Sequence, residues 1–333
     1  MPMHGHFTLE GFGRYVPERI LTNAHLEAMV ETSDEWITTR TGIKERRIAA
    51  VGEAASDMAL KASLQALDNA SRKAIDLTHI YFATFTPDAI CPPTACILED
   101  KLGLKNLPCM DISAACSGFL YALDAACGAV ALRPGSAVLV TASEVTTSRT
   151  NWADRATCVL FGDGAGAVVL SGREPKPGQA AIEDVILKSD GSLWPLLTVK
   201  SGGSAFPLKL GDTVGNDFFI YMNGPEVYKN AVRAMGSVCR EILEKNNLSM
   251  ADVDLFIPHQ ANLRIMEAVA KRLRIGPEKV MVTVDRYGNT SASAVAIALA
   301  EAVATGRIKP GDRVLLTVFG GGFTWGAVLL KFA

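Results

Sequence analysis

Cys116 is the residue in this sequence whose type and surroundings most readily suggest chemistry. It lies in the segment DISAACSGFLYAL (residues 111–123), among small residues and ahead of an apolar series typical of a buried helix. A buried cysteine often packs only as a small hydrophobe. At the first turn of a helix, unpaired N–H groups and the helix dipole favour the thiolate, which is the reactive form. The segment therefore predicts either a structural thiol or a nucleophile.

A nucleophilic cysteine normally works with a base or a positively charged neighbour, and histidine is the usual one. The chain has five histidines. His259 ends the apolar run DLFIP and opens PHQAN, at the carboxyl end of a predicted strand, where ligands gather in α/β proteins. A hydrogen-bonded core histidine is the alternative interpretation. We expect His4, His6 and His25 to be solvated and His79 to lie at a strand edge.

Two segments near the C-terminus could complete a site. Asn289, in GNTS before an alanine-rich run, could cap a helix or donate hydrogen bonds from its amide. The glycines at 320–322 would let backbone N–H groups approach a ligand, as an oxyanion site requires, although a tight turn fits equally well. The GDGAG run at 162–166 lies between two strand-like runs, so we do not favour a dinucleotide-binding loop there.

The elements that must position these residues occur twice in the same order. In the first half, a helical stretch at 53–70 is followed by a short strand, a second helix, the cysteine segment and a strand at 137–142. In the second half, a helical stretch at 228–247 is followed by a strand, a helix, the asparagine segment and a strand at 313–318. This order indicates an internal repeat.

Short β-branched runs, of which 280–284 is a further predicted strand, alternate with helices. This pattern is typical of βαβ units around a mostly parallel, buried sheet. We therefore predict an α/β protein whose two duplicated halves, residues 1–172 and 173–333, form a layered α/β/α/β/α body. Each half is expected to end in a hairpin, at 157–172 and at 313–332. Residues 173–225 are expected to form a bridge and a surface excursion. Cys116 and the Gly288–Ser291 tract are counterparts in the repeat, so a pseudo-twofold axis would bring both helix starts together.

The composition is that of an ordinary globular protein. Hydrophobic residues make up 49% of the 333 residues and the net charge is -2, which gives no global attraction to nucleic acid or to anionic membranes. The N-terminus has no signal-peptide pattern and no run of about 18 apolar residues occurs, so we expect a cytoplasmic protein without a membrane span. The seven cysteines show no C-x-x-C pair, which predicts reduced thiols and no metal site.

Seven segments together resemble a known family, the β-ketoacyl-acyl-carrier-protein synthases III of bacterial fatty-acid synthesis. The four that carry the candidate residues are AACSGF, PHQANLRI, DRYGNTSAS and FGGGFTWG. The other three are TSDEWITTRTGI, DRATCVLFGDGAGAVVL and MNGPEVYKNAV. The resemblance covers nearly the whole chain and implies the thiolase fold, whose duplicated halves agree with the repeat.

The resemblance also implies a reaction. Cys116 would attack an acyl-CoA thioester, with the N–H groups of Cys116 and Gly321 holding the oxyanion. Malonyl-acyl-carrier protein would then lose CO2, with His259 and Asn289 donating hydrogen bonds to its thioester oxygen and Phe319 bordering the reacting group. The carbanion would attack the acyl-cysteine to give a β-ketoacyl product. No cofactor and no metal would be required.

The same resemblance implies binding sites and partners. The expected CoA-binding residues are Trp36, Arg40, Arg155, Met222, Gly224 and Asn262. The expected docking residues for an acidic acyl carrier protein are Lys229, Arg264 and Lys271. A homodimer is expected, and Cys91 and Phe161 would line the acyl pocket. Many members have a phenylalanine, reaching across the dimer interface, where this chain has Cys91, so we expect room for a starter longer or more branched than acetyl.

Three other functions stay open at this point. A related condensing enzyme of a secondary pathway would use a different acceptor at nearly the same site. A papain-like hydrolase also has Cys, His and Asn in this order, but the C-G-S-C-W context and a secretion signal do not occur here. A non-enzymatic binding scaffold would not need Cys116, His259 and Asn289 at the ends of strands and helices.

Overall fold

The computed structural model describes residues 6–333. Within them the strands form a nine-stranded sheet in the order β11-β12-β13-β8-β1-β7-β6-β4-β5. Its strands are β1 (Thr8–Tyr15), β4 (His79–Ala83), β5 (Cys109–Ile112), β6 (Ala137–Glu144), β7 (Gly164–Ser171), β8 (Ala180–Ser189), β11 (Leu255–Pro258), β12 (Arg313–Gly320) and β13 (Thr324–Phe332). All except β5 and β8 are largely buried, as the β-branched runs predict.

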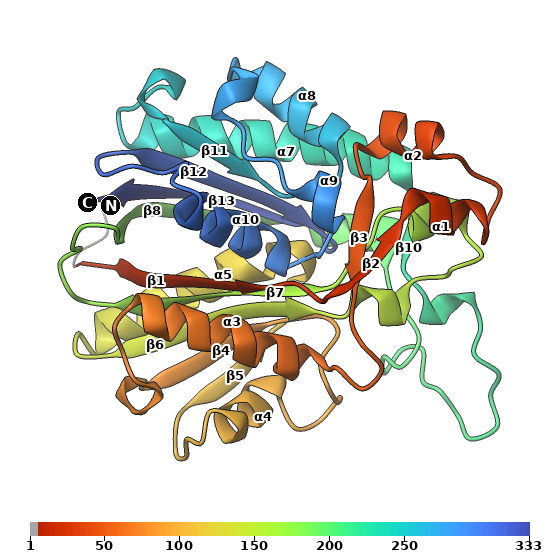
Figure 1. Cartoon of the computed structure of the whole chain (residues 1–333), viewed down its shortest axis with the longest axis horizontal. Coiled ribbons are helices and arrows are strands. Elements are labelled where there is room, and N and C mark those ends of the chain that lie inside the picture. The colour runs from red at the N-terminus through yellow and green to blue at the C-terminus, as the bar shows by residue number, and fades with distance from the viewer. Residues whose placement is uncertain (1–5) are drawn as a thin grey trace.

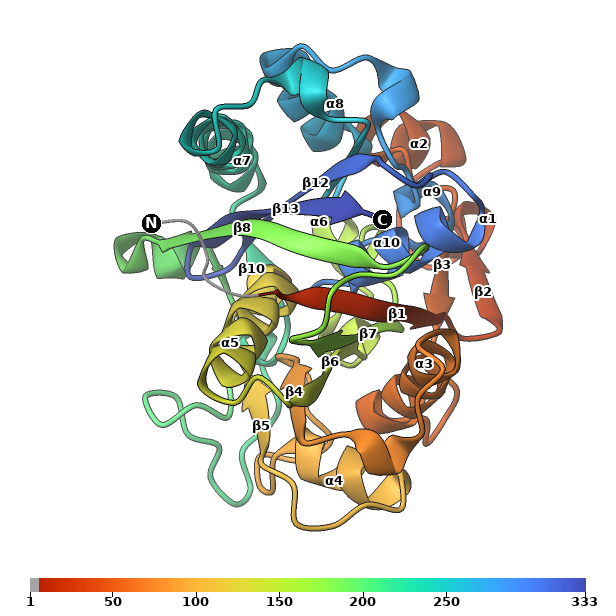
Figure 2. The same cartoon turned by 90° about the vertical axis from the view of Figure 1, so that its left-hand side faces the viewer.

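The sheet consists of two parts that meet at a short seam. β1 and β8 pair only at Thr8 with Ala181 and at Leu9 with Ala180. Helices α3 (Ala55–Asn69) and α4 (Thr94–Lys101) pack on the part that contains β1, whereas α7 (Gly224–Lys245) and α8 (Leu263–Leu273) pack on the part that contains β13. Helices α5 (Gly118–Leu132) and α10 (Ser293–Ala304) fill the space between the two parts (Figures 1 and 2).

This arrangement confirms the predicted α/β/α/β/α layering. The central layer is the most apolar one, because α5 and α10 are buried against both parts of the sheet. One helical stretch, Ala115–Leu132, is long and apolar enough to cross a membrane by length and composition alone. Its burial in this layer accounts for its apolar character. The division at residue 172 stays a prediction.

Smaller elements cover the end of the molecule at which the parallel strands finish. They are β2 (Arg19–Thr22), β3 (Glu45–Ile48), α1 (Asn23–Glu27), α2 (Asp34–Thr41), α6 (Arg155–Cys158), β9 (Leu197–Thr198), β10 (Tyr221–Met222) and α9 (Val284–Tyr287). Their apolar residues form a separate cluster around Ile37, Phe161 and Met266. This cluster closes one side of the region where the candidate residues lie.

Two predicted elements are wrong, and close packing explains the first. Residues 157–172 do not form a hairpin, because 155–158 are the helix α6 and β7 pairs instead with β1 and β6. The glycines of this segment permit close approach rather than a turn: a Cβ on Gly166 would lie 2.5 Å from the Cβ of Ala296 in α10. The apolar run at 280–284 forms only a single bridge, from Val280 to Phe256, and then enters α9.

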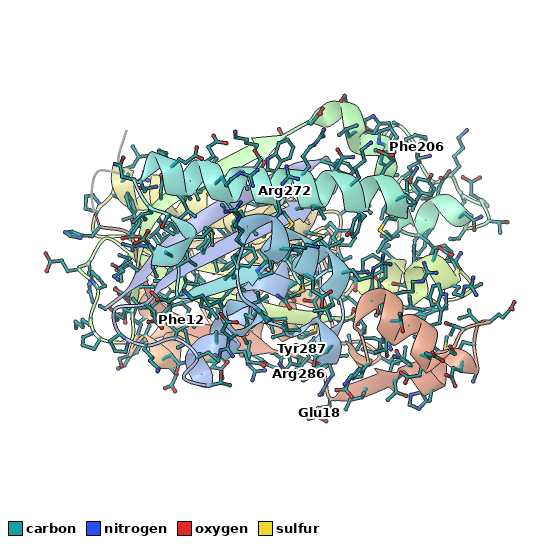
Figure 3. The ribbon with its side chains drawn as sticks, turned by 90° about the horizontal axis from the view of Figure 1, so that it is seen from above. Phe12, Glu18, Phe206, Arg272, Arg286 and Tyr287 are labelled. Atoms are coloured by element: carbon teal, nitrogen blue, oxygen red, sulfur yellow. The ribbon has the colours of Figure 1, made fainter. Side chains whose placement is uncertain are left out.

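The sheet corrects one further expectation and confirms another. The bridge predicted at 173–225 contains β8, a full member of the sheet, and only its later part is the exposed excursion. Phe206 in this excursion lies at the margin of the molecule in Figure 3. The C-terminal hairpin is confirmed, since β12 and β13 pair from Arg313 with Lys331 to Gly320 with Thr324.

Candidate active site

Cys116 lies in a 3-10 turn, Ala115–Ser117, that follows β5 and runs directly into α5. Ala115 has a φ of 46°, a left-handed conformation that non-glycine residues rarely adopt and that is common at functional sites. Cys116 is 8% exposed. Burial raises the pKa of its thiol to about 12, and the negative charge of Glu144 adds to the rise. Burial therefore opposes the ionised form of the thiol at this helix start.

His259 directly follows β11, as predicted, and its N–H donates to the carbonyl of Thr317 at 2.8 Å. The imidazole is buried, and burial lowers its pKa to about 4. Its Nδ1 is buried without a hydrogen-bond partner among the described residues. His259 is therefore neutral at pH 7 and can present an N–H group without a positive charge.

Asn289 is held by its backbone in the loop before α10. Its N–H donates to the carbonyl of Leu160 at 2.8 Å, and its carbonyl accepts from the N–H of Gly162 at 3.1 Å. Its Oδ1 accepts from the N–H of Ser291 at 2.9 Å, so its NH2 group is left to act as a donor. The N-cap residue of α10 is Ala292, so Asn289 does not cap that helix.

These three residues line a single cavity of about 990 Å³. Cys116 comes from the end of β5, His259 from the end of β11 and Asn289 from the loop before α10, so both halves of the chain contribute. The predicted residues that also line this cavity are Trp36, Arg40, Phe161, Met222, Gly224, Asn262, Arg264, Phe319 and Gly321. The chain thus brings most of the predicted site together.

The glycine run after Phe319 packs against Cys116. A Cβ on Gly320 would lie 2.7 Å from the backbone nitrogen of Cys116, so no larger residue fits there. The two segments are also tied by hydrogen bonds from Ser117 Oγ to the carbonyl of Thr324 at 3.0 Å and from Thr324 Oγ1 to the carbonyl of Ala114 at 3.1 Å. The ring of Phe319 lies 4.7 Å from that of Phe323. These contacts fix the backbone N–H groups beside Cys116.

Trp36 and two arginines form a stack at one wall of the cavity. Ser33 caps α2 through the N–H of Trp36, which orients the indole. The guanidinium carbon of Arg155 lies 4.8 Å from the ring centroid and that of Arg40 lies 5.8 Å from it. Arg155 does not itself line the cavity, and its Nη1 donates to the carbonyl of Glu31 at 2.9 Å. A planar group that stacked on Trp36 would be close to both cations.

Asn262 has a structural role that the sequence did not reveal. Its Oδ1 accepts from the N–H of Arg264 at 2.9 Å and caps α8, while its Nδ2 donates to the carbonyl of Arg40 at 3.2 Å. Both polar groups of the side chain are therefore engaged although Asn262 lines the cavity. This residue joins α8 to α2.

Besides Arg155, three predicted residues do not line the cavity, namely Cys91, Lys229 and Lys271. Cys91 is exposed in the loop before α4 and does not line the cavity. Lys229 on α7 and Lys271 on α8 are exposed, and the two helices lie side by side (Figure 1). Gly236 permits this contact, since a Cβ there would meet the side chain of Arg272 (Figure 3).

The other histidines lie away from the cavity. His6 is 3.7 Å from Glu174, His25 is exposed and bonds to Thr22 at the start of α1, and His79 is the buried first residue of β4. His4 lies outside the described residues. Within residues 6–333 there is also no group of three or more His, Cys, Asp or Glu residues that could hold a metal ion.

Sequence reasoning missed Glu144 and Ser291. Glu144 ends the fully buried strand β6, and burial raises the pKa of its carboxyl to about 7. Ser291 lines the cavity and its hydroxyl donates to Glu144 Oε1 at 3.2 Å. A charged residue at the carboxyl end of an apolar strand was a usable signal, since the same argument found His259.

Comparison with known proteins gives matches along the whole chain. The family model of 3-oxoacyl-[acyl-carrier-protein] synthase III matches residues 110–191, and that of its C-terminal part matches residues 243–332. The β-ketoacyl-[acyl-carrier-protein] synthase III of Oleidesulfovibrio alaskensis is 58% identical over 96% of this chain and 97% of its own length. That of Nitratidesulfovibrio vulgaris strain DP4 is 56% identical over 97% and 98%. The crystal structure of the Aquifex aeolicus VF5 3-oxoacyl-[acyl-carrier-protein] synthase III has a TM-score of 0.88 at 46% identity, covering 98% and 100%.

Proposed function

The chain belongs to the 3-oxoacyl-[acyl-carrier-protein] synthase III family, and from this premise we propose how its site carries out the family's reaction. The protein is an acyltransferase that initiates fatty-acid synthesis by condensing an acyl-CoA with malonyl-acyl-carrier protein. The observation that supports this function best is the single cavity shared by Cys116, His259 and Asn289.

In the first half-reaction, Cys116 takes the acyl group. Its sulfur attacks the thioester carbonyl, and the charge moves onto the carbonyl oxygen. The backbone N–H groups of Cys116 and Gly321 receive that oxyanion, because the glycine run packs directly against the nucleophile. Collapse of the tetrahedral intermediate releases CoA and leaves an acyl-cysteine.

In the second half-reaction, malonyl-acyl-carrier protein loses CO2 and its thioester becomes an enolate. Negative charge develops on the thioester oxygen, where two neutral donors are available. These are the N–H of the neutral His259 and the NH2 of Asn289, whose Oδ1 is already occupied by Ser291. Phe319 borders the site and keeps water out. The carbanion attacks the acyl-cysteine and gives the β-ketoacyl product.

The CoA arm lies along the wall formed by α2, β10 and α7. Trp36 stacks on the adenine, while Arg40 and Arg155 neutralise phosphate groups, which suits the two guanidinium groups within 6 Å of the indole. Met222, Gly224 and Asn262 line the passage from this stack towards Cys116. Asn262 is held in place by α8 and α2, which leaves one N–H of its amide to face the passage.

Partners and surroundings complete the proposal. An acidic acyl carrier protein docks on Lys229, Arg264 and Lys271, of which Arg264 reaches the cavity. The protein is a cytoplasmic homodimer and needs no metal or redox cofactor. In support of the dimer, β5 is an edge strand and carries the exposed Met110, and the loop with Ile90 and Cys91 beside it is also exposed.

The rival functions have less support. A papain-like hydrolase would need a different fold from the layered one described above. A binding scaffold has no need of a buried cysteine beside a neutral histidine and an oriented amide. A condensing enzyme of a secondary pathway would share the fold. It would differ from the proposed enzyme in the acceptor that it uses.

The test is to incubate the protein with acyl-CoA and malonyl-acyl-carrier protein and to follow CO2 together with a β-ketoacyl-carrier product. We expect both in equal amounts. Peptide cleavage without condensation would instead favour a hydrolase, and no reaction would favour a scaffold. Condensation with another malonyl acceptor in preference to the carrier protein would favour the secondary pathway.

The starter is tested in the same assay with acetyl-, isobutyryl- and octanoyl-CoA. Mass spectrometry of the protein then shows which acyl group Cys116 retains. Because Cys91 replaces a larger residue, we expect turnover with the longer or branched starters. A sharp preference for acetyl-CoA would contradict the enlarged pocket, but not the reaction itself.

A further inference from the structure

Gln260 is a buried amide, 1% exposed, with no part in the steps described so far. It makes four hydrogen bonds, all to backbone groups. Its Nε2 donates to the carbonyls of Pro258 at 2.7 Å and Met281 at 3.0 Å. Its Oε1 accepts from the N–H groups of Thr283 at 2.7 Å and Val284 at 3.2 Å. A glutamine amide has two N–H donors and two lone pairs, so each of its hydrogen-bonding positions is used.

On one side, Gln260 holds the backbone of His259. Its bond to the carbonyl of Pro258 reaches back past His259 and closes a ring of atoms that contains this residue. The N–H of His259 is bonded to the carbonyl of Thr317 at 2.8 Å. The imidazole Nδ1 is buried without a partner among the described residues, so no hydrogen bond of that atom orients the ring. The direction of the imidazole therefore depends on the backbone that Thr317 and Gln260 hold.

On the other side, Gln260 caps the helical turn that leads to Asn289. Thr283, the N-cap residue of α9, makes no side-chain cap of its own, so the Oε1 of Gln260 takes the first N–H groups of the turn instead. The turn closes with a bond from the N–H of Gly288 to the carbonyl of Val284 at 3.0 Å. Asn289 is the next residue, so the position of its side chain depends on where α9 begins.

Only an amide of this length joins the two loops in this way. The two carbonyls must face the NH2 group of Gln260, and the two N–H groups must face its oxygen, so the partners fix the orientation of the amide. An ionised glutamate has no donor for the carbonyls, and a methionine of similar length has no donor and only a weak acceptor. Either change breaks the link between the loop of His259 and the turn before Asn289.

We infer that Gln260 is a positioning residue for decarboxylation, whose amide sets the separation between the imidazole of His259 and the NH2 group of Asn289. This inference deepens the proposed function and rests on it. Both donors must reach the same thioester oxygen as its negative charge develops, and a misplacement of about 1 Å can slow a reaction by about 10²-fold. None of the four bonds reaches the segment that carries Cys116, so acylation does not depend on them.

A purely structural role for Gln260 predicts a different result. If its bonds only stabilised the fold, their loss would lower the fraction of folded protein and reduce both half-reactions alike. The rate per acylated molecule would then stay unchanged. If the bonds place the two donors, only the decarboxylation step slows, and it slows even when each molecule is counted by its acyl-cysteine.

The experiment compares the wild type with Gln260→Met, which keeps the length of the side chain and removes the amide. Acylation by acyl-CoA is followed by mass spectrometry in a single turnover, which also counts the active molecules. Malonyl-acyl-carrier protein is then added to the acyl-enzyme and CO2 release is measured at several concentrations. We expect acylation within about twofold of the wild type and a maximal rate of CO2 release about tenfold lower or less, at an unchanged half-saturating concentration. Equal losses in both steps, or an unchanged rate of CO2 release, would overturn the inference.

Gln260→Glu is the conservative variant and Asn246→Leu is the matched control. A glutamate keeps the acceptor for α9 and, when protonated, one donor, so its loss of decarboxylation should be smaller than that of Gln260→Met. The Nδ2 of Asn246 donates to Asp184 Oδ2 at 2.8 Å and to the carbonyl of Ile242 at 2.7 Å, and Asn246 does not line the cavity. Asn246→Leu should keep both rates per acylated molecule, and a loss equal to that of Gln260→Met would contradict a specific role. Should Gln260→Met fail to fold, Gln260→Glu carries the test with the same split between the steps.

The effect of Gln260→Met should also depend on the donors that Gln260 places. In Asn289→Ala one of the two donors is already gone, so Gln260→Met should slow decarboxylation by a smaller factor there than in the wild type. Such non-additivity is expected for residues that act through one another. Equal factors in the two backgrounds would show that Gln260 does not act through Asn289 and would overturn the inference.

The inference can fail separately from the proposed function. If the wild type forms no acyl-cysteine and releases no CO2, the proposed function is wrong. Crystal structures of the wild type and of Gln260→Met test the positioning without any substrate. We expect the distance between the Cα atoms of His259 and Asn289 to change by about 0.5 Å or more, which is the tolerance of a productive site. A smaller change would overturn the inference whatever reaction the protein catalyses.

Discussion

At the scale of single residues, we propose that the site divides the reaction between the nucleophile Cys116 and two neutral hydrogen-bond donors, His259 and Asn289. Asn289 has its Oδ1 occupied by Ser291, and His259 has a pKa of about 4, so both present N–H groups at neutral pH. Both line the same cavity as Cys116. Loss of a donor and loss of the thiol should therefore affect different steps.

Asn289→Ala and Cys116→Ala separate these steps. Cys116→Ala should abolish acylation, whereas Asn289→Ala should spare it and slow decarboxylation by about 10²-fold, the usual effect of removing one donor to an oxyanion. Acyl-enzyme formation is measured by mass spectrometry and decarboxylation by CO2 release. Acylation blocked as severely by Asn289→Ala as by Cys116→Ala would refute this division.

Glu144 and His259 should also shape the dependence of stability on pH. Burial raises the pKa of Glu144 from 4.5 to about 7, so the stability it contributes is complete below pH 4.5 and is lost as the pH rises through 7. The shift is worth about 3 kcal/mol at 1.36 kcal/mol per unit. Burial lowers the pKa of His259 from 6.5 to about 4, so its contribution is present above pH 6.5 and is lost as the pH falls through 4.

Glu144→Gln should remove one of these opposing slopes. The free energy of unfolding of the variant, minus that of the wild type, should increase by about 3 kcal/mol between pH 4.5 and pH 8. Urea titrations at several pH values measure this difference, and Ser293→Ala serves as the control with an unchanged slope. If the free energies of unfolding of Glu144→Gln and the wild type changed with pH in parallel, the pKa of Glu144 would be the same in the folded and unfolded states.

The sequence identified Cys116, His259 and Asn289 because each follows or precedes a recognisable apolar element. Ser291 and Glu144 escaped that reasoning, since their link depends on the meeting of β6, the loop after β4 and the start of α10. The 147 positions between them leave no local pattern. Long-range convergence of this kind is visible only once the fold is known.

At the scale of elements, close backbone contacts decide where helices sit. A Cβ on Gly13 of β1 would lie 2.0 Å from the carbonyl oxygen of Ala62 in α3. The same requirement at Gly166 explains why a glycine-rich segment predicted to turn is instead a straight strand under α10. Glycine spacing in the sequence does not tell a turn from a contact, so the predicted hairpin at 157–172 was wrong.

Gly13→Ala tests this contact. The added methyl group must push α3 away from β1, and overpacking of this kind costs about 1–3 kcal/mol. Gly128→Ala is the matched control, because Gly128 lies in α5 with no atom within 4 Å of an added Cβ, and alanine there should stabilise by up to about 1 kcal/mol. Urea unfolding measures both. Equal effects would show that the contact between α3 and β1 is not tight.

At the scale of the whole molecule, the internal repeat predicted the layers correctly. The repeat depends on the order of the elements, so a wrong assignment of one segment does not affect it. The protein has a net charge of -2, so recognition of an acidic partner depends on a local surface. Lys229 on α7 and Lys271 on α8 present positive charge on two adjacent helices.

Reversal of these two charges tests the docking surface. Lys229→Glu with Lys271→Glu should raise KM for malonyl-acyl-carrier protein by about tenfold, and more at low salt, since exposed pairs contribute up to about 1 kcal/mol each. Acylation by acyl-CoA should stay unchanged. Lys309→Glu, in the exposed turn before β12, is the control. If KM stayed unchanged, or if Lys309→Glu raised it equally, the carrier protein would have to dock on another surface.

The short seam between the two parts of the sheet has a consequence for chain connectivity. β8 pairs with β1 on one side and with β13 on the other. Thr8 of β1 lies opposite Ala181, and Phe332 of β13 lies opposite Ala180. Thr8 and Phe332 are therefore separated by only two strand spacings, or about 10 Å. A short linker could therefore connect the chain at Phe332 to the chain at Thr8. New termini could be placed in the exposed segment around Leu210. Such a circular permutant should fold and keep its activity, because the site is assembled by packing across the layers and not by the order in which the chain visits them.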